Sequence, residues 1–194
     1  MILTLTGASG AGKSTLAKAL IRLLPSAELS PGTTTRAMRH GETSADVHHL
    51  SQDKFSEMHQ RGEFLWTVEV HGLWYGTLRR VVADGLKARA HCLLFALTPD
   101  VLPILRDFAK ESGHGKEVRS IYVLSPEPSA LRSRLGARGD DKDTIERRLN
   151  DCKTWDASAR SSNLYDLLVP GDGDVEQNAR GIIDSLAILN TNTS

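Results

Sequence analysis

The sequence predicts an α/β protein in which a parallel β-sheet is covered by helices on both faces. Short apolar runs alternate with longer segments whose apolar residues recur at helical spacing. Runs such as 91–97 and 120–124 are apolar without a polar face, which is typical of parallel strands buried on both sides. The chain has 194 residues, of which 40% are hydrophobic and 25% are charged, so it is long enough to form one well-buried domain.

The expected elements follow in order along the chain. A strand over 1–6 leads into a glycine-rich turn and then a helix, which Pro25 ends, and 27–30 reads as a short strand. Ser51 is the expected N-cap of a helix that ends near Gln60. The remaining expected strands are 64–70, 91–97, 120–124 and 165–169, and the remaining expected helices are 78–89, 99–112, 129–137, 143–159 and 174–189.

One domain over 1–190 is expected, followed by a polar tail, 191–194, that is too short to fold alone. The segment 33–77 is more polar than the rest and interrupts the alternation of strands and helices. We therefore expect a core made of 1–32 and 78–190, with 33–77 as an inserted lobe.

Composition and charge exclude several classes of protein. The 24 basic and 24 acidic residues cancel, so no overall field draws the chain to nucleic acid or to a membrane surface. No apolar stretch approaches the roughly 20 residues that span a bilayer, and the chain starts with a strand rather than a signal peptide. Cys92 and Cys152 give no disulfide framework, so a reducing cytoplasm is the expected location.

The most specific local signal is a phosphate-binding loop (P-loop) of the form G-x-x-x-x-G-K-[ST]. Glycines let backbone N–H groups close around a phosphate, and the helix that follows adds its positive N-terminal end. In such loops the lysine reaches the β- and γ-phosphates and the next hydroxyl binds Mg²⁺, which are the roles expected of Lys13 and Ser14. The chain is expected to bind ATP through Gly7, Ala8, Ser9, Gly10, Ala11, Gly12, Lys13, Ser14 and Thr15.

Further motifs follow at set distances: TTTRAMRHGE at 33–42, GEFL at 62–65, VHGLWYGT at 70–77 and RGD at 138–140. Together with the P-loop, they resemble the guanylate kinase family over nearly the whole chain. The resemblance implies a P-loop NTPase fold in which 33–77 binds a phosphorylated acceptor and about 132–150 forms a helical lid.

The resemblance assigns the acceptor to the inserted lobe. Arg36 and Arg39 would bind its phosphate, which suits the forked guanidinium group, and Tyr75 would add a hydroxyl. Glu42 would orient an arginine, and Thr77 completes the acceptor residues. The acceptor implied is GMP or a related nucleoside monophosphate.

The lid would supply charge to the transferring group. Arg138 and Arg148 would close over the ATP phosphates, where a positioned arginine can be worth about 10³-fold or more in rate. With Lys13 and Arg39 they make up the expected catalytic residues.

The residues that read guanine in the family are replaced at several positions. Gly32 and Trp66 stand where the family has a serine and an acidic residue, and Leu97 ends a strand that lacks the acidic triplet. Trp66 is expected to be a core residue or a stacking surface. Glu69 is a candidate replacement carboxylate for the acceptor, and Asp100 is a candidate Mg²⁺ ligand in addition to Ser14.

Two alternatives remain open on the sequence. GLWYG at 72–76 is similar to the ribose 1,5-bisphosphate phosphokinases, which resemble guanylate kinases without base recognition. Guanylate-kinase-like domains also occur as non-catalytic binding modules, but the intact Lys13 and Ser14 favour an enzyme. The expected partner is a small phosphorylated substrate, with no nucleic acid and no membrane, and the chain is expected to be a monomer or a homodimer.

Overall fold

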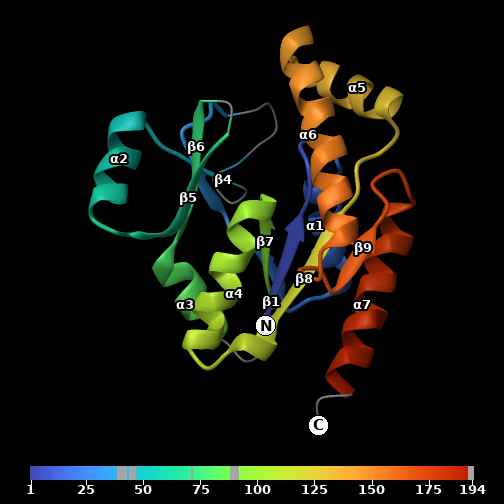
Figure 1. Ribbon diagram of the computed structural model, residues 1–194. Coiled ribbons are helices and arrows are strands. Elements are labelled where there is room, and N and C mark those ends of the chain that lie inside the picture. Colours follow the sequence, from blue (N-terminus) through green and yellow to red (C-terminus); the bar gives the residue numbers. More distant parts are fainter. Residues whose placement is uncertain (39–42, 44–46, 71, 88–91, 192–194) are drawn as a thin grey trace. The chain divides into compact units, whose positions relative to one another are not determined.

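The structure is a computed structural model that describes residues 1–38, 43, 47–70, 72–87 and 92–191 (Figure 1). Its elements are β1 (Ile2–Thr6), α1 (Lys13–Leu23), β2 (Ala27–Leu29), β3 (Gly32–Thr34), β4 (Val47–His49), α2 (Gln52–Gln60), β5 (Phe64–Val70), β6 (Leu73–Leu78), α3 (Arg79–Lys87), β7 (Cys92–Leu97), η1 (Pro99–Val101), α4 (Leu102–Glu111), η2 (Gly115–Glu117), β8 (Val118–Val123), α5 (Pro128–Gly136), α6 (Lys142–Ser161), β9 (Leu167–Val169) and α7 (Val175–Thr191).

The predicted α/β class with a parallel sheet flanked by helices is confirmed. Five strands form a sheet in the order β2-β7-β1-β8-β9. The register is parallel where Ala27 faces Cys92 and where Ile121 faces Leu167. All five residues of β1 are buried, as expected for a strand covered on both faces. No helix in the described part of the chain is both long enough and apolar enough to cross a bilayer.

A second sheet of four strands, in the order β4-β3-β6-β5, was only partly predicted. The sequence indicated β5 but not the other three strands. β3 (Gly-Thr-Thr) and β4 (Val-His-His) are short and have no apolar run, and the apolar pattern of β6 is interrupted by Gly76 and Thr77. β6 pairs antiparallel with both β5 and β3, and β3 pairs parallel with β4.

The chain divides into two compact units. One comprises Met1–Leu3, Ser26–Phe95 and Asp100–Arg119, and the other comprises Thr4–Pro25, Ala96–Pro99 and Ser120–Ser194. The segment 33–77, predicted as an acceptor lobe, falls within the first unit together with β2, α3 and α4. The P-loop residues and the predicted lid segment fall within the second.

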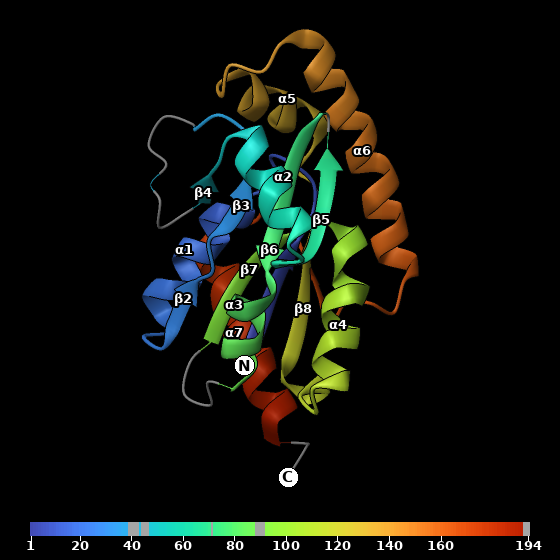
Figure 2. The same ribbon diagram turned by 90° about the vertical axis from the view of Figure 1, so that its left-hand side faces the viewer.

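In the first unit, α2 covers one face of the four-stranded sheet (Figure 2). Ser51 is the N-cap that the sequence predicted, because its hydroxyl accepts from the Lys54 N–H over 3.2 Å. Phe55 on α2 stacks on Phe64 of β5 at 4.6 Å between ring centroids and lies 6.1 Å from Trp74 of β6. This aromatic contact fixes which sheet face is buried under α2 and which is left for other contacts.

In the second unit, α1 lies beside α7, and an ion pair joins Arg22 of α1 to Glu176 of α7 (Figure 1). α5 and α6 form a helical pair after β8. Asp141 caps α6 by accepting from the Thr144 N–H over 2.9 Å, and this bond holds the pKa of the Asp141 carboxyl below its usual value. The predicted helices 129–137 and 143–159 correspond to these two elements.

Candidate functional site

The P-loop connects β1 to α1 through three glycines in the left-handed region, with φ of 146° at Gly7, 87° at Gly10 and 108° at Gly12. A Cβ atom on Gly7 would lie 2.4 Å from the carbonyl oxygen of Val123, so glycine is also required there for space. Gly12 is the N-cap of α1, and its lack of a side chain leaves the N-terminal N–H groups of the helix open to an anion.

The Lys13 side chain contacts the backbone of this loop. Its Nζ atom lies 2.6 Å from the Gly7 carbonyl oxygen and 2.8 Å from the Ala8 carbonyl oxygen. The ammonium group is therefore held beside the backbone groups that would surround a phosphate. Ser14 and Thr15 lie in the first turn of α1 with exposed side chains, so the hydroxyl that the sequence assigned to Mg²⁺ is accessible. The donor set fits a nucleotide phosphate and its Mg²⁺ ion.

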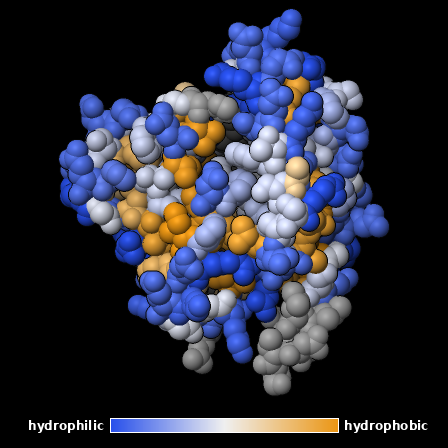
Figure 3. Space-filling view, in the orientation of Figure 1, coloured by the Kyte–Doolittle hydropathy of each residue, from blue (hydrophilic) through white to orange (hydrophobic). Residues whose placement is uncertain are grey.

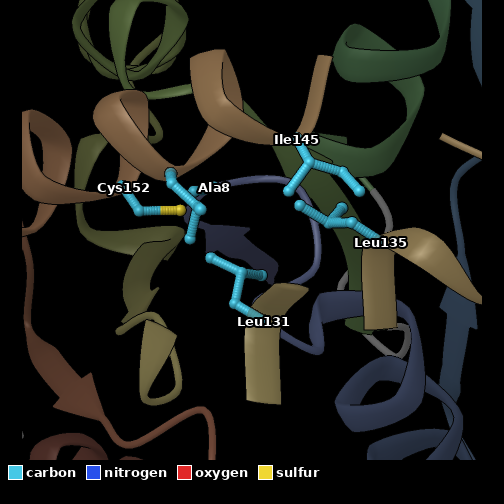
Figure 4. Close-up of a cluster of buried hydrophobic side chains, with 6 residues drawn as sticks. Ala8, Leu131, Leu135, Ile145 and Cys152 are labelled. Carbon is cyan, nitrogen blue, oxygen red and sulfur yellow. The ribbon is translucent and has the colours of Figure 1, made fainter. Parts of the chain in front are cut away.

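The α5–α6 pair is fastened to the P-loop by apolar side chains. Ala8 packs in a buried cluster with residues of both helices: Leu131, Leu135, Ile145, Leu149 and Cys152. Figure 4 shows Ala8 beside the sulfur of Cys152 and next to Leu131. Burial raises the pKa of the Cys152 thiol, which keeps it protonated, so this cysteine packs as an apolar residue rather than acting as a nucleophile.

Arg134 joins the P-loop to the loop after β9, and the sequence did not single it out as a site residue. Its Nη1 atom donates to the carbonyl oxygens of Gly10 (3.2 Å) and Gly171 (3.1 Å). Gly171 itself packs so closely that a Cβ atom there would lie 2.6 Å from the Ala11 carbonyl oxygen. These contacts fix the backbone of the loop that the sequence predicts to bind the nucleotide.

The predicted lid arginines differ in their surroundings. Arg148 on α6 forms an ion pair with Asp140, and the two side chains are only 12% and 16% exposed. Arg138 lies exposed after α5, next to Gly139, which takes a positive φ of 83°. Hydrophilic residues cover the end of the α5–α6 pair, as Figure 3 shows. Arg138 is therefore accessible to an anion, while Arg148 is already oriented by a carboxylate.

Tyr75 and Thr77, two of the expected acceptor residues, lie on the sheet face opposite α2. Directly paired residues share a face, and the register pairs Tyr75 with both Thr34 and Val68, and Thr77 with Trp66. Tyr75 and Thr77, two residues apart on β6, therefore lie on one face. Two of the expected acceptor residues are brought together in this way.

Arg36 follows the end of β3, where several contacts fix the backbone. Its N–H donates to the Thr34 hydroxyl (3.1 Å), which donates to the Trp74 carbonyl oxygen (2.8 Å). Its carbonyl oxygen lies 2.7 Å from Nδ1 of His49. Its side chain, half-buried, donates to the Ala37 carbonyl oxygen. Arg39 and Glu42 lie outside the described residues, so their predicted roles stay predictions.

Glu69 does not take the place of an acidic residue at position 66. The two residues are three apart on a regular stretch of β5, so they point to opposite faces of the sheet. Glu69 is exposed and is paired with Trp74, whose ring contacts α2. The register places Glu69 on the face with α2, opposite to the face that carries Tyr75 and Thr77, and its role toward the acceptor stays a prediction.

Trp66 is a core residue, as predicted. It is 6% exposed and meets Phe95 of β7 edge-on at 6.5 Å between ring centroids. Asp100 lies exposed in the short 3₁₀ turn η1 before α4. Within the described residues, no group of three acidic, histidine or cysteine side chains converges on a metal position, so Asp100 as a ligand stays a prediction.

Comparison with known proteins places this geometry in a family. The profile of the family described as "Guanylate kinase" matches residues 1–186. The chain is 41% identical over 143 residues to a guanylate kinase of Thiobacillus denitrificans, covering 73% of this chain and 65% of that protein. It is 34% identical over 174 residues to a guanylate kinase of Anaeromyxobacter dehalogenans, covering 89% and 74%.

Solved structures agree on the fold. A crystal structure of guanylate kinase from Anaplasma phagocytophilum matches with a TM-score of 0.71 at 22% identity, covering 97% of this chain and 85% of that one. Shikimate kinase from Acinetobacter baumannii in complex with shikimate matches with a TM-score of 0.53 at 16% identity, covering 97% and 93%. Both are P-loop NTPase folds, which confirms the predicted fold. The family profile, the relatives and the P-loop together show that this chain belongs to the guanylate kinase family.

Proposed function

We propose that this protein transfers the γ-phosphoryl group of ATP to the phosphate of GMP. The observation that carries the proposal is the P-loop, in which Lys13 is held over the carbonyl oxygens of Gly7 and Ala8 at an open helix N-terminus. Relatives at 34% and 41% identity bear the name guanylate kinase. This supports GMP over a ribose bisphosphate, and an enzyme over a non-catalytic binding module.

The chemistry would be direct in-line transfer, because an acceptor phosphate is already anionic and needs no general base. Lys13 would neutralise the β- and γ-phosphates, and Arg138 and Arg148 would stabilise the charge on the group in transit. Ser14 would hold Mg²⁺, which supplies further neutralisation of the ATP phosphates when bound. Arg36, Arg39, Tyr75 and Thr77 would hold the acceptor, with Glu42 orienting an arginine.

The guanine base would be read without a carboxylate on the face that carries Tyr75 and Thr77, because position 66 is a buried tryptophan and Glu69 lies on the opposite face. The acceptor phosphate would therefore carry more of the binding than the base does. Both cysteines are buried and free, which fits our proposal of a reducing compartment such as the cytoplasm.

The test is an acceptor panel. ADP release from ATP and Mg²⁺ is followed with GMP, dGMP, AMP, UMP and ribose 1,5-bisphosphate, each at the same concentration, and without acceptor. We expect GMP and dGMP to give the highest rates. Turnover with the ribose bisphosphate and none with nucleotides would overturn GMP as the acceptor, and ATP binding without any turnover would overturn the enzymatic role.

A further inference from the structure

His49 contacts the backbone of the loop that carries Arg36. Its Nδ1 atom lies 2.7 Å from the Arg36 carbonyl oxygen, across 13 residues of sequence. A carbonyl oxygen only accepts hydrogen bonds, so Nδ1 must carry the hydrogen and donate it. If the imidazole is neutral, this fixes its tautomer, with the hydrogen on Nδ1 rather than Nε2.

The other backbone group of Arg36 is also held by a side chain. Its N–H donates to the Thr34 hydroxyl over 3.1 Å, and Thr34 is itself fixed by the bond to the Trp74 carbonyl oxygen. Thr34 is fully buried, so this side of the residue is anchored in the sheet. The peptide groups on both sides of the Arg36 Cα atom are therefore tied to strands, one to β3 and one to β4.

The register of the β3–β4 pair brings His49 within reach of the Arg36 backbone. It pairs with Thr34 in the parallel β3–β4 ladder, and Thr34 pairs with Tyr75 in the β3–β6 ladder. His49, Thr34 and Tyr75 therefore lie in one row on the face opposite α2. Its neighbour His48 pairs with Thr33 and points to the other face with an exposed side chain.

We propose that His49 is a positioning residue that holds Arg36 in the orientation in which it binds the acceptor phosphate. This inference rests on the proposed function, in which Arg36 binds the phosphate of GMP. A planar guanidinium binds a phosphate through two parallel hydrogen bonds only when it is correctly aimed. Small displacements of such a group are costly, with about 1 Å of misplacement able to cost about 10²-fold. The Nδ1–H donor of His49 prevents rotation of the peptide group that follows Arg36.

The kinetic test compares His49→Phe with His49→Asn. Phenylalanine keeps the size of the ring but cannot donate, whereas the amide nitrogen of asparagine reaches the position of Nδ1 and can. We expect His49→Phe to raise KM for GMP about tenfold, with kcat and KM for ATP changed less than about twofold, as one lost hydrogen bond suggests. His49→Asn should stay within about threefold of wild type. His48→Phe is the matched control and should leave all three constants unchanged.

Two results would overturn the proposal. One is an unchanged KM for GMP in His49→Phe, and the other is a His49→Asn protein that is as impaired as His49→Phe. The melting temperature of each variant is measured beside the kinetics, because a general loss of folding would lower kcat rather than raise the KM for GMP alone. If His49→Phe does not fold, the proposal is tested by the KM for GMP of His49→Asn and by the NMR spectrum described next.

A second measurement needs no activity. The imidazole nitrogens of the ¹⁵N-labelled wild-type protein are observed by NMR, and the His49 signals are assigned by their absence in His49→Asn. We expect a hydrogen on Nδ1. A neutral ring with its hydrogen on Nε2 overturns the proposal even if GMP is turned over, which leaves the proposed function standing. A wild-type protein that transfers no phosphoryl group overturns the proposed function, and with it the role given to His49.

Discussion

The hydroxyl group of Tyr122 donates a hydrogen bond to Oδ1 of Asp156 over 2.8 Å, which joins β8 to α6. The same carboxylate accepts from the N–H of Ser125 at 2.9 Å and from its hydroxyl at 3.2 Å. The long helix that carries Arg148 is thus anchored to the chain just after β8. This anchor and the apolar cluster around Ala8 fix the base of the predicted lid to the P-loop unit.

We predict that Asp156→Ala lowers the free energy of unfolding by about 2–4 kcal/mol, because it leaves the fully buried Tyr122 hydroxyl and the Ser125 N–H without an acceptor. Tyr122→Phe removes only one donor and should cost about 1 kcal/mol. Urea unfolding followed by circular dichroism measures both. A larger loss for Tyr122→Phe than for Asp156→Ala would contradict this assignment.

The same contact makes stability depend on alkaline pH. Burial, followed by the bond to Asp156, raises the pKa of Tyr122 well above its ordinary value. The native state keeps the hydroxyl protonated, whereas the unfolded chain ionises it near pH ~10. The contribution of Tyr122 to the free energy of unfolding is therefore fully present below about pH 10. It is lost as pH rises further, at up to about 1.4 kcal/mol per pH unit.

The check is urea unfolding over a range of roughly one pH unit on either side of the ordinary tyrosine pKa. Wild-type stability should fall more steeply than that of Tyr122→Phe across this range. Parallel curves for the two proteins would show that Tyr122 ionises equally in the native and unfolded states.

Two glycine-to-alanine substitutions should act in opposite directions. At Gly171 the new Cβ would lie 2.1 Å from the Leu124 carbonyl oxygen and 2.6 Å from the Ala11 carbonyl oxygen, so backbone must move. We expect Gly171→Ala to lower stability by about 3 kcal/mol or more and to weaken ATP binding. At Gly181 in α7, no described atom beyond its chain neighbours and the backbone of its own helix lies within 4 Å of the position that a methyl group would take. Gly181→Ala should therefore raise stability by about 0.5–1 kcal/mol.

Thermal unfolding and ATP titration of both variants test this pair. A Gly171→Ala protein with wild-type melting temperature and ATP affinity would show that the loop after β9 does not pack against the P-loop in solution.

Arg138 and Arg132 are two exposed arginines in the predicted lid segment, so their variants can be compared directly. Arg138→Met should lower kcat by at least about 10²-fold with little change in KM, because a charge aimed at the transferring group acts in the transition state. Arg132 is engaged with Glu146 on the surface, where such an ion pair contributes little, so Arg132→Met should keep wild-type kcat. Steady-state rates at saturating ATP and GMP measure both. Equal losses in the two variants would argue against a specific role for Arg138.

Local signals predicted the fold well where an element carries its own pattern. β5 was predicted with its observed bounds, and the Ser51 cap and the helix after it were recognised from their residues. β3, β4 and β6 were missed because distant pairing makes them strands, as where Thr34 pairs with Tyr75. Gly76 looks like a turn residue but lies inside β6, where the Phe64 ring would be 2.8 Å from any Cβ.

The candidate site also has residues that local sequence reveals and residues that only distant contacts reveal. The P-loop is contiguous, so its residues could be named from the sequence alone. Arg134 reaches Gly10 across 124 residues and His49 reaches Arg36 across 13, and neither contact has a signal in a single sequence. The sheet face on which Glu69 lies could not be read from the sequence, because one position of register decides which face a side chain occupies. Only the assignment of strand partners fixes that register.

The most direct test of the central claim is the formation of GDP from GMP by wild type and by Lys13→Ala, measured side by side by chromatography with ATP and Mg²⁺ present. We predict that wild type forms ADP and GDP in equal amounts. Lys13→Ala should be slower by about 10³-fold or more while remaining folded, since it removes the charge beside the Gly7 and Ala8 carbonyl oxygens. A wild-type protein that binds ATP and forms no GDP, or a Lys13→Ala protein that forms it at the wild-type rate, would contradict the claim.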